Sequence, residues 1–157
     1  MFKVSRLTDY GVVILGYLFE RSESSREPAS ARDLAQVSGL PLPTVSKLLK
    51  LMAKYKLVAA KRGANGGYEL LENPQAISLL RVVEIFEGPP AATSCMMDTS
   101  NHCQIHHACP QRNSWHLVQQ RVAQVLSDIS VFELIKPQTK TVADLAHGRY
   151  QDVQRSH

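Results

Sequence analysis

Apolar residues recur at helical spacing in the first third of the chain and predict three successive helices. The first is expected over about residues 7–21, where apolar side chains fall every three or four positions. Ser30 and Asp33 form a capping box that opens the second helix, and Gly39 ends it because glycine tolerates a left-handed backbone. The third is expected over about residues 42–56, with a proline in its first turn. Its buried face is predicted to comprise Val45, Leu48, Leu49 and Met52.

A β-hairpin is predicted directly after the third helix. The stretch "LVAAKRGANGGYELL", residues 57–71, reads as two short strands around a glycine-rich turn. Its Asn65-Gly66 pair is a strong hairpin signal because both residues tolerate positive φ. Helix, turn, helix and hairpin in this order are typical of a winged helix. The predicted fold class is therefore mainly α with a small β-hairpin wing, followed by a long C-terminal helix.

The C-terminal part of the chain carries a different apolar pattern. Ser78 is expected to cap a fourth helix that ends near Gly88. Farther along, apolar residues at intervals of 3, 4, 3, 4 and 3 form a seam of the coiled-coil kind. A second capping signal, Ser130 to Glu133, indicates that the helix carrying this seam breaks near Asp128. The seam residues are Trp115, Val118, Val122, Val125, Ile129 and Phe132.

The seam predicts a homodimer. The alternative is that it packs back on its own domain, but three helices already suffice to close that core. A second stripe of 3.5-residue period more readily pairs with another copy of the chain. Two-fold pairing also matches a palindromic DNA site.

The length of 157 residues suits one compact domain with an appendage. Hydrophobic residues make up 44% of the chain, which is enough for a packed core. We expect a winged helix-turn-helix domain over 1–88, a cysteine-containing loop over 89–113, a dimerisation helix over 114–136 and a polar, flexible tail over 137–157.

Positive charge is concentrated where a winged helix meets DNA. The net charge of +4 and the isoelectric point of about 9.1 permit an acidic partner but do not define one. Lys47, Lys50 and Lys54 share one stripe of the third helix, and Lys61 and Arg62 open the hairpin. A helix fits the major groove, lysines neutralise phosphates, and a wing arginine can enter the narrow minor groove. We therefore favour double-stranded DNA as the partner over lysines that merely form a solvated face.

Other function classes find less support in the sequence. No phosphate loop, nucleotide fingerprint or nucleophile–base pattern indicates an enzyme. A protein-interaction adaptor that uses the winged helix for docking remains the alternative from another class. The apolar stretch Val12–Phe19 is too short to span a membrane, and we recognise no secretory signal. These features predict a cytoplasmic protein without membrane contact, in which thiols stay reduced.

All three cysteines lie in one polar stretch, "SCMMDTSNHCQIHHACP", residues 94–110. Their spacing is C-x7-C-x5-C, which lacks the close pairs typical of zinc sites and of dithiol redox centres. Three thiolates in a loop suit an iron–sulfur cluster that takes a further ligand from elsewhere. From spacing alone, a cluster, zinc and free reactive thiols all stay open. The residues concerned are Cys95, Cys103 and Cys109.

Several segments together resemble a known family. They are "RLTDYG" (6–11), "LPTVSKLLKLMAKYKLV" (42–58), "RGANGGYEL" (62–70) and the three cysteines. The combination resembles the Rrf-two (Rrf2) family of winged-helix transcription regulators, the IscR and NsrR type, over roughly residues 1–136. Within the family it is most similar to regulators of SUF-type iron–sulfur cluster assembly.

The resemblance implies a homodimeric repressor that binds promoter DNA and is switched by an iron–sulfur cluster. The recognition-helix positions of the family fall on Thr44, Ser46 and Lys47, beside Lys50 of the same stripe, and its minor-groove arginine falls on Arg62. A regulator of this fold whose cysteines hold zinc, or act as a bare-thiol sensor of redox state or nitric oxide, is the alternative.

The resemblance also implies the ligands of the cluster, with the thiolates falling on the three cysteines. Family members with a fourth histidine ligand place it where this chain has Arg112, a poor ligand because guanidinium stays protonated. Members of the NsrR type use an N-terminal aspartate of the partner chain, and Asp9 matches it. His102, His106 and His107 are the alternative ligands. We favour a 2Fe–2S cluster, with 4Fe–4S as the alternative because the first cysteine gap is longer than in the commonest members.

Overall fold

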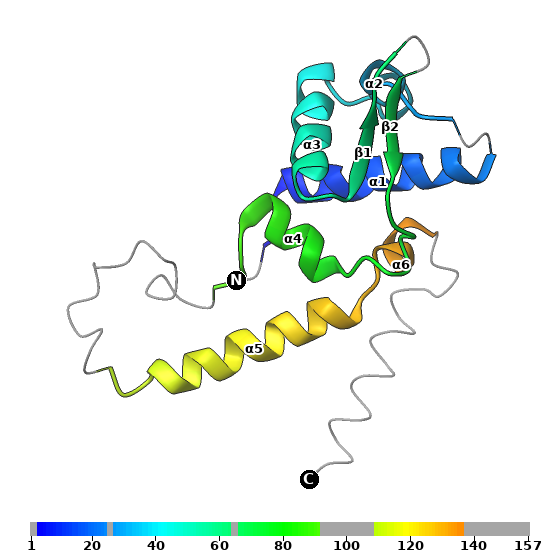
Figure 1. The fold of residues 1–157 in the computed structure, drawn as a ribbon. Helices are drawn as coiled ribbons and strands as arrows, with labels where there is room; N and C mark the ends of the chain where they lie inside the picture. Colours follow the sequence, from blue (N-terminus) through cyan, green and yellow to red (C-terminus); the bar gives the residue numbers. More distant parts are fainter. Residues whose placement is uncertain (1–2, 25–26, 64–65, 92–108, 137–157) are drawn as a thin grey trace.

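The computed structural model describes residues 3–24, 27–63, 66–91 and 109–136. Within these residues a helical head carries a two-stranded hairpin, and a long helix extends from it (Figure 1). The predicted fold class is confirmed. The elements in chain order are α1 (Arg6–Ser24), α2 (Ala31–Ser38), α3 (Leu42–Lys54), β1 (Val58–Lys61), β2 (Gly67–Leu70), α4 (Leu79–Glu87), α5 (Arg112–Asp128) and α6 (Val131–Ile135).

The helix-turn-helix is formed by α2 and α3, and its end signals are those expected from the sequence. The Ser30 hydroxyl accepts from the backbone N–H of Asp33, and the Asp33 carboxylate accepts from the N–H of Ser30. Gly39 then adopts a left-handed conformation with φ of 68°. Helix α3 ends two residues earlier than expected, at Lys54, and Lys56 takes a φ of 59° before the chain enters β1.

The wing is an antiparallel hairpin fastened to the loop before α2. Strands β1 and β2 pair with Val58 opposite Leu70 and Lys61 opposite Gly67. Ala29 and Tyr68 exchange both backbone hydrogen bonds, at 2.9 and 2.8 Å. A Cβ on Gly67 would lie 2.7 Å from the backbone of Ala29, so this close approach requires glycine.

One hydrophobic core joins the head. The four α3 residues predicted to be buried are fully inaccessible, as are Ile14 and Leu15 of α1 and Val82 of α4. The helices pack around this core and fix α3 with its other face outward. The side chains shared by the core and α3 are Val45, Leu48, Leu49 and Met52.

A backbone junction links α4 to the C-terminal elements. The N–H of Leu79 donates to the carbonyl of Ile129, and the N–H of Val131 donates to the carbonyl of Ile77, both at 2.8 Å. Ser78 and Ser130, which cap α4 and α6, are therefore bridge partners. We call these paired segments, 77–79 and 129–131, the cap junction.

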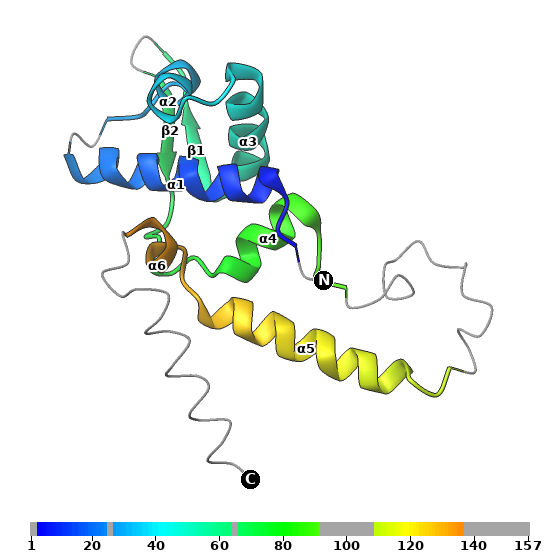
Figure 2. The same cartoon turned by 180° about the vertical axis from the view of Figure 1, so that it is seen from behind.

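Helix α5 is shorter than the predicted dimerisation segment 114–136. It ends at Asp128, where the second capping signal predicted a break, and α6 follows as a separate helix. Phe132 of α6 packs against Phe19 of α1 edge to face, with ring centroids 5.5 Å apart. Ile129 and Phe132 thus leave the seam, because the chain turns back to its own head at the cap junction. Figures 1 and 2 show α5 running below α4 and extending beyond the head.

Candidate functional site

The outward face of α3 carries the predicted DNA-contacting side chains. Lys47 and Lys50 are exposed, and Thr44 and Ser46 are half-buried on the first turns of the same helix. Lys54, at the end of the stripe, lies with its ammonium 5.4 Å from the ring centroid of Tyr55. Because the opposite face of α3 is locked in the core, these polar side chains are held outward on a rigid helix.

The wing presents one arginine beside this helix. Lys61 forms an ion pair with Glu69 on the neighbouring strand at 2.8 Å, so it is partly neutralised. Arg62 follows it at the exposed tip and makes no hydrogen bond or ion pair with the residues that the structure describes. The structure therefore brings Arg62 to the hairpin tip as expected, and distinguishes it from its basic neighbour.

The proposed cluster ligands are only partly described. Cys95, Cys103, His102, His106 and His107 lie outside the described residues. Among the residues with defined placement, no group of three or more metal-ligating side chains converges. Cys109 is a half-buried free thiol three residues before α5, and Asp9 is exposed on the first turn of α1.

These two donors belong to separate ends of the fold. The first turn of α1 lies beside the end of α4, whereas α5 begins well away from it in both ribbon views (Figures 1 and 2). The chain therefore does not bring Asp9 to the start of α5 near its own Cys109. A thiolate and a carboxylate are both suitable iron ligands, so the chemistry of the available donors fits a cluster.

Two apolar surfaces are left uncovered among the residues that the structure describes. Along α5, Trp115, Leu117, Val118 and Val125 are 43–54% exposed. An open groove of about 730 Å³ runs along α1 to α6. We call it the α1 groove; it is lined by Val4, Ser5, Arg6, Thr8, Asp9, Val12, Val13, Gly16, Tyr17, Glu20, Leu79, Leu134 and Ile135.

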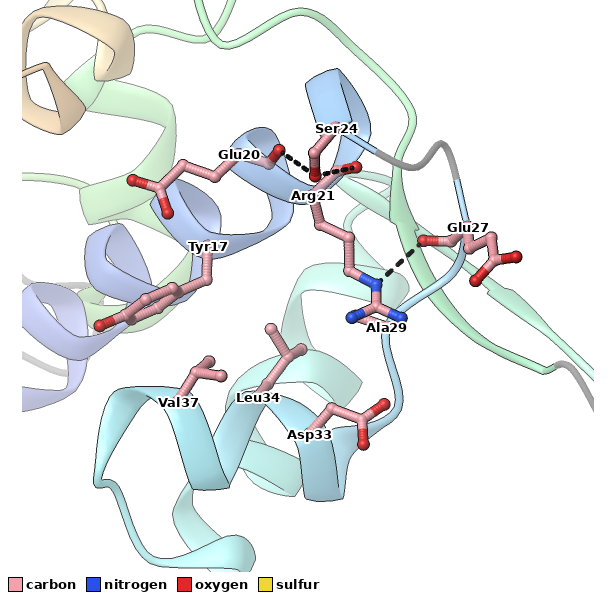
Figure 3. Close-up of a pocket in the computed structure, with 9 residues that line it drawn as sticks. All are labelled: Tyr17, Glu20, Arg21, Ser24, Glu27, Ala29, Asp33, Leu34 and Val37. Atoms are coloured by element: carbon pink, nitrogen blue, oxygen red, sulfur yellow. Dashed lines mark hydrogen bonds between the residues drawn. The ribbon is translucent and has the colours of Figure 1, made fainter.

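A second, smaller pocket of about 400 Å³ lies between α1 and α2 (Figure 3). Three of its polar side chains already have local partners. The Ser24 hydroxyl donates to the carbonyl of Glu20 at 2.9 Å, Arg21 Nε donates to the carbonyl of Glu27, and Asp33 belongs to the capping box. The pocket is therefore an open crevice between α1 and α2 in which part of the polar lining is already hydrogen-bonded.

A polar network that the sequence analysis missed fastens α1 to α4. Thr8 is fully buried, and its hydroxyl donates to Oε1 of Glu87. The same oxygen accepts from the backbone N–H of Ser5 at 2.9 Å. The sequence separation of 82 residues hid this contact, since nothing local marks Glu87 as a partner of α1.

The fold and its exposed cations together define a winged-helix DNA-binding protein. Residues 4–137 match the Rrf2 family, which is described as iron-dependent transcriptional regulators. The match covers most of the chain, so the protein belongs to the Rrf2 family.

Relatives agree with this assignment over nearly the whole chain. The chain is 28% identical to the HTH-type transcriptional regulator IscR of Pectobacterium atrosepticum over 152 residues, covering 96% of this chain and 90% of the relative. The corresponding protein of Yersinia pseudotuberculosis is 26% identical with the same coverage.

Solved structures of two regulators share the fold. CymR, the global cysteine regulator of B. subtilis, superposes with a TM-score of 0.62 at 25% identity, over 86% of this chain and 97% of CymR. IscR of T. potens gives a TM-score of 0.60 at 26% identity, over 85% of this chain and 86% of that protein.

The chain is thus a transcriptional regulator homologous to IscR, and the expectation that it is not an enzyme is confirmed by its relatives. Membership of this family implies DNA binding. Within the described residues, no helix has the length and apolar character needed to cross a lipid bilayer.

Proposed function

We propose that the protein is a cytoplasmic, homodimeric repressor of iron–sulfur cluster assembly genes whose DNA binding is switched by an iron–sulfur cluster. The observation that carries the DNA-binding part is the exposed basic stripe of α3 together with the exposed Arg62 of the wing. The sensing part is supported by kinship with IscR and by the three cysteines, one of which immediately precedes α5. A 2Fe–2S cluster is favoured over 4Fe–4S.

In the proposed complex α3 lies in the major groove. Thr44, Ser46 and Lys47 are on its N-terminal turns, the part of a recognition helix that usually reaches base edges. Lys50 contacts phosphate, and Arg62 enters the adjacent minor groove from the wing.

The dimer is proposed to form through α5. Helix α5 exposes more large apolar side chains than is usual for a helix surface that stays in contact with solvent. A second copy of the chain would cover them. The α1 groove is a further uncovered apolar surface on the same chain. Together these surfaces support an interface in which each copy covers the α5 of the other.

The cluster is proposed to take thiolates from Cys95, Cys103 and Cys109 and a carboxylate from Asp9 of the second copy. The separation of Asp9 from the start of α5 within one chain supports ligation across the dimer. When bound, such a cluster supplies a centre that oxidants or cluster loss can alter. Asp9 contributes a weakly held ligand, and Cys109 connects the site directly to α5.

The connection to α5 suggests how the signal reaches DNA. A change at Cys109 acts on the first turn of α5, and the other end of α5 is bonded to α4 through the cap junction. Two copies joined along α5 would then hold their α3 helices at different spacings with and without cluster. A switch requires such a difference in contacts between its two states.

Arg62 provides the test of DNA binding. Arg62→Ala should weaken promoter binding about tenfold or more and reduce the salt slope of log affinity by about one, because one phosphate-proximal cation is lost. Arg62→Lys is the matched control; it should keep the salt slope and lose only the preference for a narrow, A·T-rich groove. Unchanged binding of Arg62→Ala at physiological salt would show that the wing does not contact DNA.

Anaerobic purification tests the cofactor. A cluster protein is brown and contains iron and sulfide, whereas the zinc and bare-thiol alternatives are colourless. The adaptor alternative predicts no salt-dependent binding to duplex DNA.

Mixed dimers test ligation across the subunits. One subunit carries Asp9→Ala and the other carries Cys103→Ala. If Asp9 ligates across the dimer, both lesions fall on one site and the dimer keeps about one cluster in place of two. Two impaired sites would mean that Asp9 ligates the cluster of its own chain. An Asp9→Ala homodimer that keeps both clusters would show that Asp9 is not a ligand and direct attention to His102, His106 or His107.

A further inference from the structure

The first turn of α1 is capped by a residue from another helix. Ser5 precedes α1, and its hydroxyl accepts from the backbone N–H of Thr8, three positions later, at 3.3 Å. In a capping box, a carboxylate at that third position would form the reciprocal hydrogen bond by accepting from the N–H of Ser5. Here the third position holds Thr8, and the carboxylate comes from Glu87 at the end of α4.

A single oxygen of Glu87 makes both contacts. Oε1 accepts from the Ser5 N–H at 2.9 Å and from the Thr8 hydroxyl, which also lies 3.2 Å from the hydroxyl of Ser5. Partial burial raises the pKa of the Glu87 carboxyl, but the hydrogen bonds from Thr8 and Ser5 outweigh it and leave the pKa below its usual value. Ionised acceptors make stronger hydrogen bonds than neutral ones, and a negative charge is favoured at a helix N-terminus.

Close packing reinforces this cap one turn later. A Cβ on Gly11 would lie 2.4 Å from Cε2 of Phe86, the residue before Glu87. The first two turns of α1 are thus held against the last turn of α4 at two consecutive points. Asp9 lies between them, and its N–H donates to the carbonyl of Ser5 at 3.1 Å.

We propose that Glu87 is a positioning residue that caps the first turn of α1 from α4 and thereby fixes the backbone that presents Asp9. The proposal rests on the function proposed for Asp9 as a ligand across the dimer. Helix ends fray when their free N–H groups lack acceptors, so a ligand on an uncapped first turn would be held less firmly.

Amide hydrogen exchange of the cluster-free protein tests the cap itself. Glu87→Ala should raise exchange about tenfold or more at residues 8–11, because two hydrogen bonds to a charged acceptor are lost. Glu87→Gln should show a much smaller increase than Glu87→Ala, since an amide oxygen can replace Oε1 as an acceptor but makes weaker hydrogen bonds without the charge. Glu84→Ala is the matched control, because Glu84 is an exposed glutamate on the same helix. Thr8→Val keeps the buried shape but removes the hydroxyl, and it should show an intermediate increase. Unchanged exchange in Glu87→Ala would overturn the proposal.

The rate of cluster loss from the anaerobically loaded dimer tests the consequence. Glu87→Ala should lose its cluster several-fold faster than wild type, Glu84→Ala should match wild type, and Glu87→Gln should lie between them. If Glu87→Gln keeps the protection of residues 8–11 but loses its cluster as fast as Glu87→Ala, the charge of Glu87 acts directly on the cluster and the positioning role is refuted. If wild type holds no cluster, the proposed sensing function fails, whereas the exchange experiment still decides whether Glu87 caps α1.

Discussion

Helices α3 and α5 carry similar apolar patterns, but the apolar face of α3 is buried and that of α5 is largely exposed. In α3, Leu48 and Met52 are fully buried, and the stripe facing away from them is basic. In α5, Val118 is 43% and Val125 is 52% exposed, although both occupy regular seam positions. Periodicity alone therefore shows that a helix has an apolar face, and the surroundings decide what covers it.

This difference in burial means that the head is stabilised by its own core, whereas the apolar face of α5 is not. The head closes its own core, so the direction of α3 is set before any partner binds. The apolar face of α5 is left exposed among the described residues, so the association proposed above would change its surroundings. In that proposal, α3 reads DNA as a fixed surface and α5 carries the response to the cluster.

Truncation of a core residue should produce the largest effect. Leu48→Ala is expected to lower the free energy of unfolding by about 2–5 kcal/mol, because it removes buried methyl groups and leaves a cavity. Val118→Ala should change the unfolding of the isolated subunit by less than about 0.5 kcal/mol. Urea denaturation at low protein concentration measures both. Equal losses for the two variants would mean that α5 is packed within its own chain.

A charge on α5 should disrupt association while sparing the fold. Val125→Glu is expected to raise the dimer dissociation constant about a hundredfold, since two buried carboxylates would face an apolar surface. Gln120→Glu adds the same charge at an exposed polar position of α5 and should leave association unchanged. Sedimentation measures the mass, and circular dichroism confirms the helices. An intact Val125→Glu dimer would move the interface elsewhere.

The tight docking of the wing can be tested at Gly67. Gly67→Ala should destabilise the head by about 1–3 kcal/mol, because the new Cβ meets backbone atoms of Ala29 that cannot turn aside. Gly16→Ala is the matched control. Its Cβ would lie 3.4 Å from Ile135, an ordinary contact within a helix, so it should be neutral or stabilising. Thermal unfolding of both variants decides whether wing docking is as rigid as the distances indicate.

The smallest effect concerns pH and the cap of α2. Hydrogen bonding by the side chain and backbone of Ser30 holds the pKa of Asp33 below its usual value. The resulting stabilisation is present above the pKa of the unfolded chain, about 4, and is lost as pH falls through the lower folded value. Asp33→Asn should therefore reduce stability slightly at neutral pH, and this difference should disappear in acid. A difference that persists undiminished at pH 2 would contradict the assignment.

Local signals predicted the head well. The capping box at Ser30, the left-handed Gly39 and the pairing of the two hairpin strands all involve residues near one another in sequence, so propensity and spacing were sufficient. Asn65 of the predicted turn lies outside the described residues. The buried face of α3 followed from helical period. The break after Asp128 was also visible, as a capping signal at Ser130.

Contacts between distant segments were not predictable. Nothing in the sequence joins Glu87 to Ser5, because an acidic residue at a helix end is usually solvated. The apolar spacing predicted that the seam continues to Phe132, because spacing alone does not show that the chain changes direction between α5 and α6. The roles of Thr44, Ser46, Lys47, Lys50 and Arg62, like those of Asp9 and the cysteines, remain predictions.

The cap junction has a consequence for how the protein can change over generations. Its two bonds, from Leu79 to Ile129 and from Val131 to Ile77, are made entirely by main-chain atoms. Any residue except proline can donate at positions 79 and 131. The two bonds between α5 and the head therefore do not depend on side-chain identity, whereas the buried side chains of Ile77 and Val131 are constrained by their packing in the core. The link can persist while exposed side chains on either side of it change.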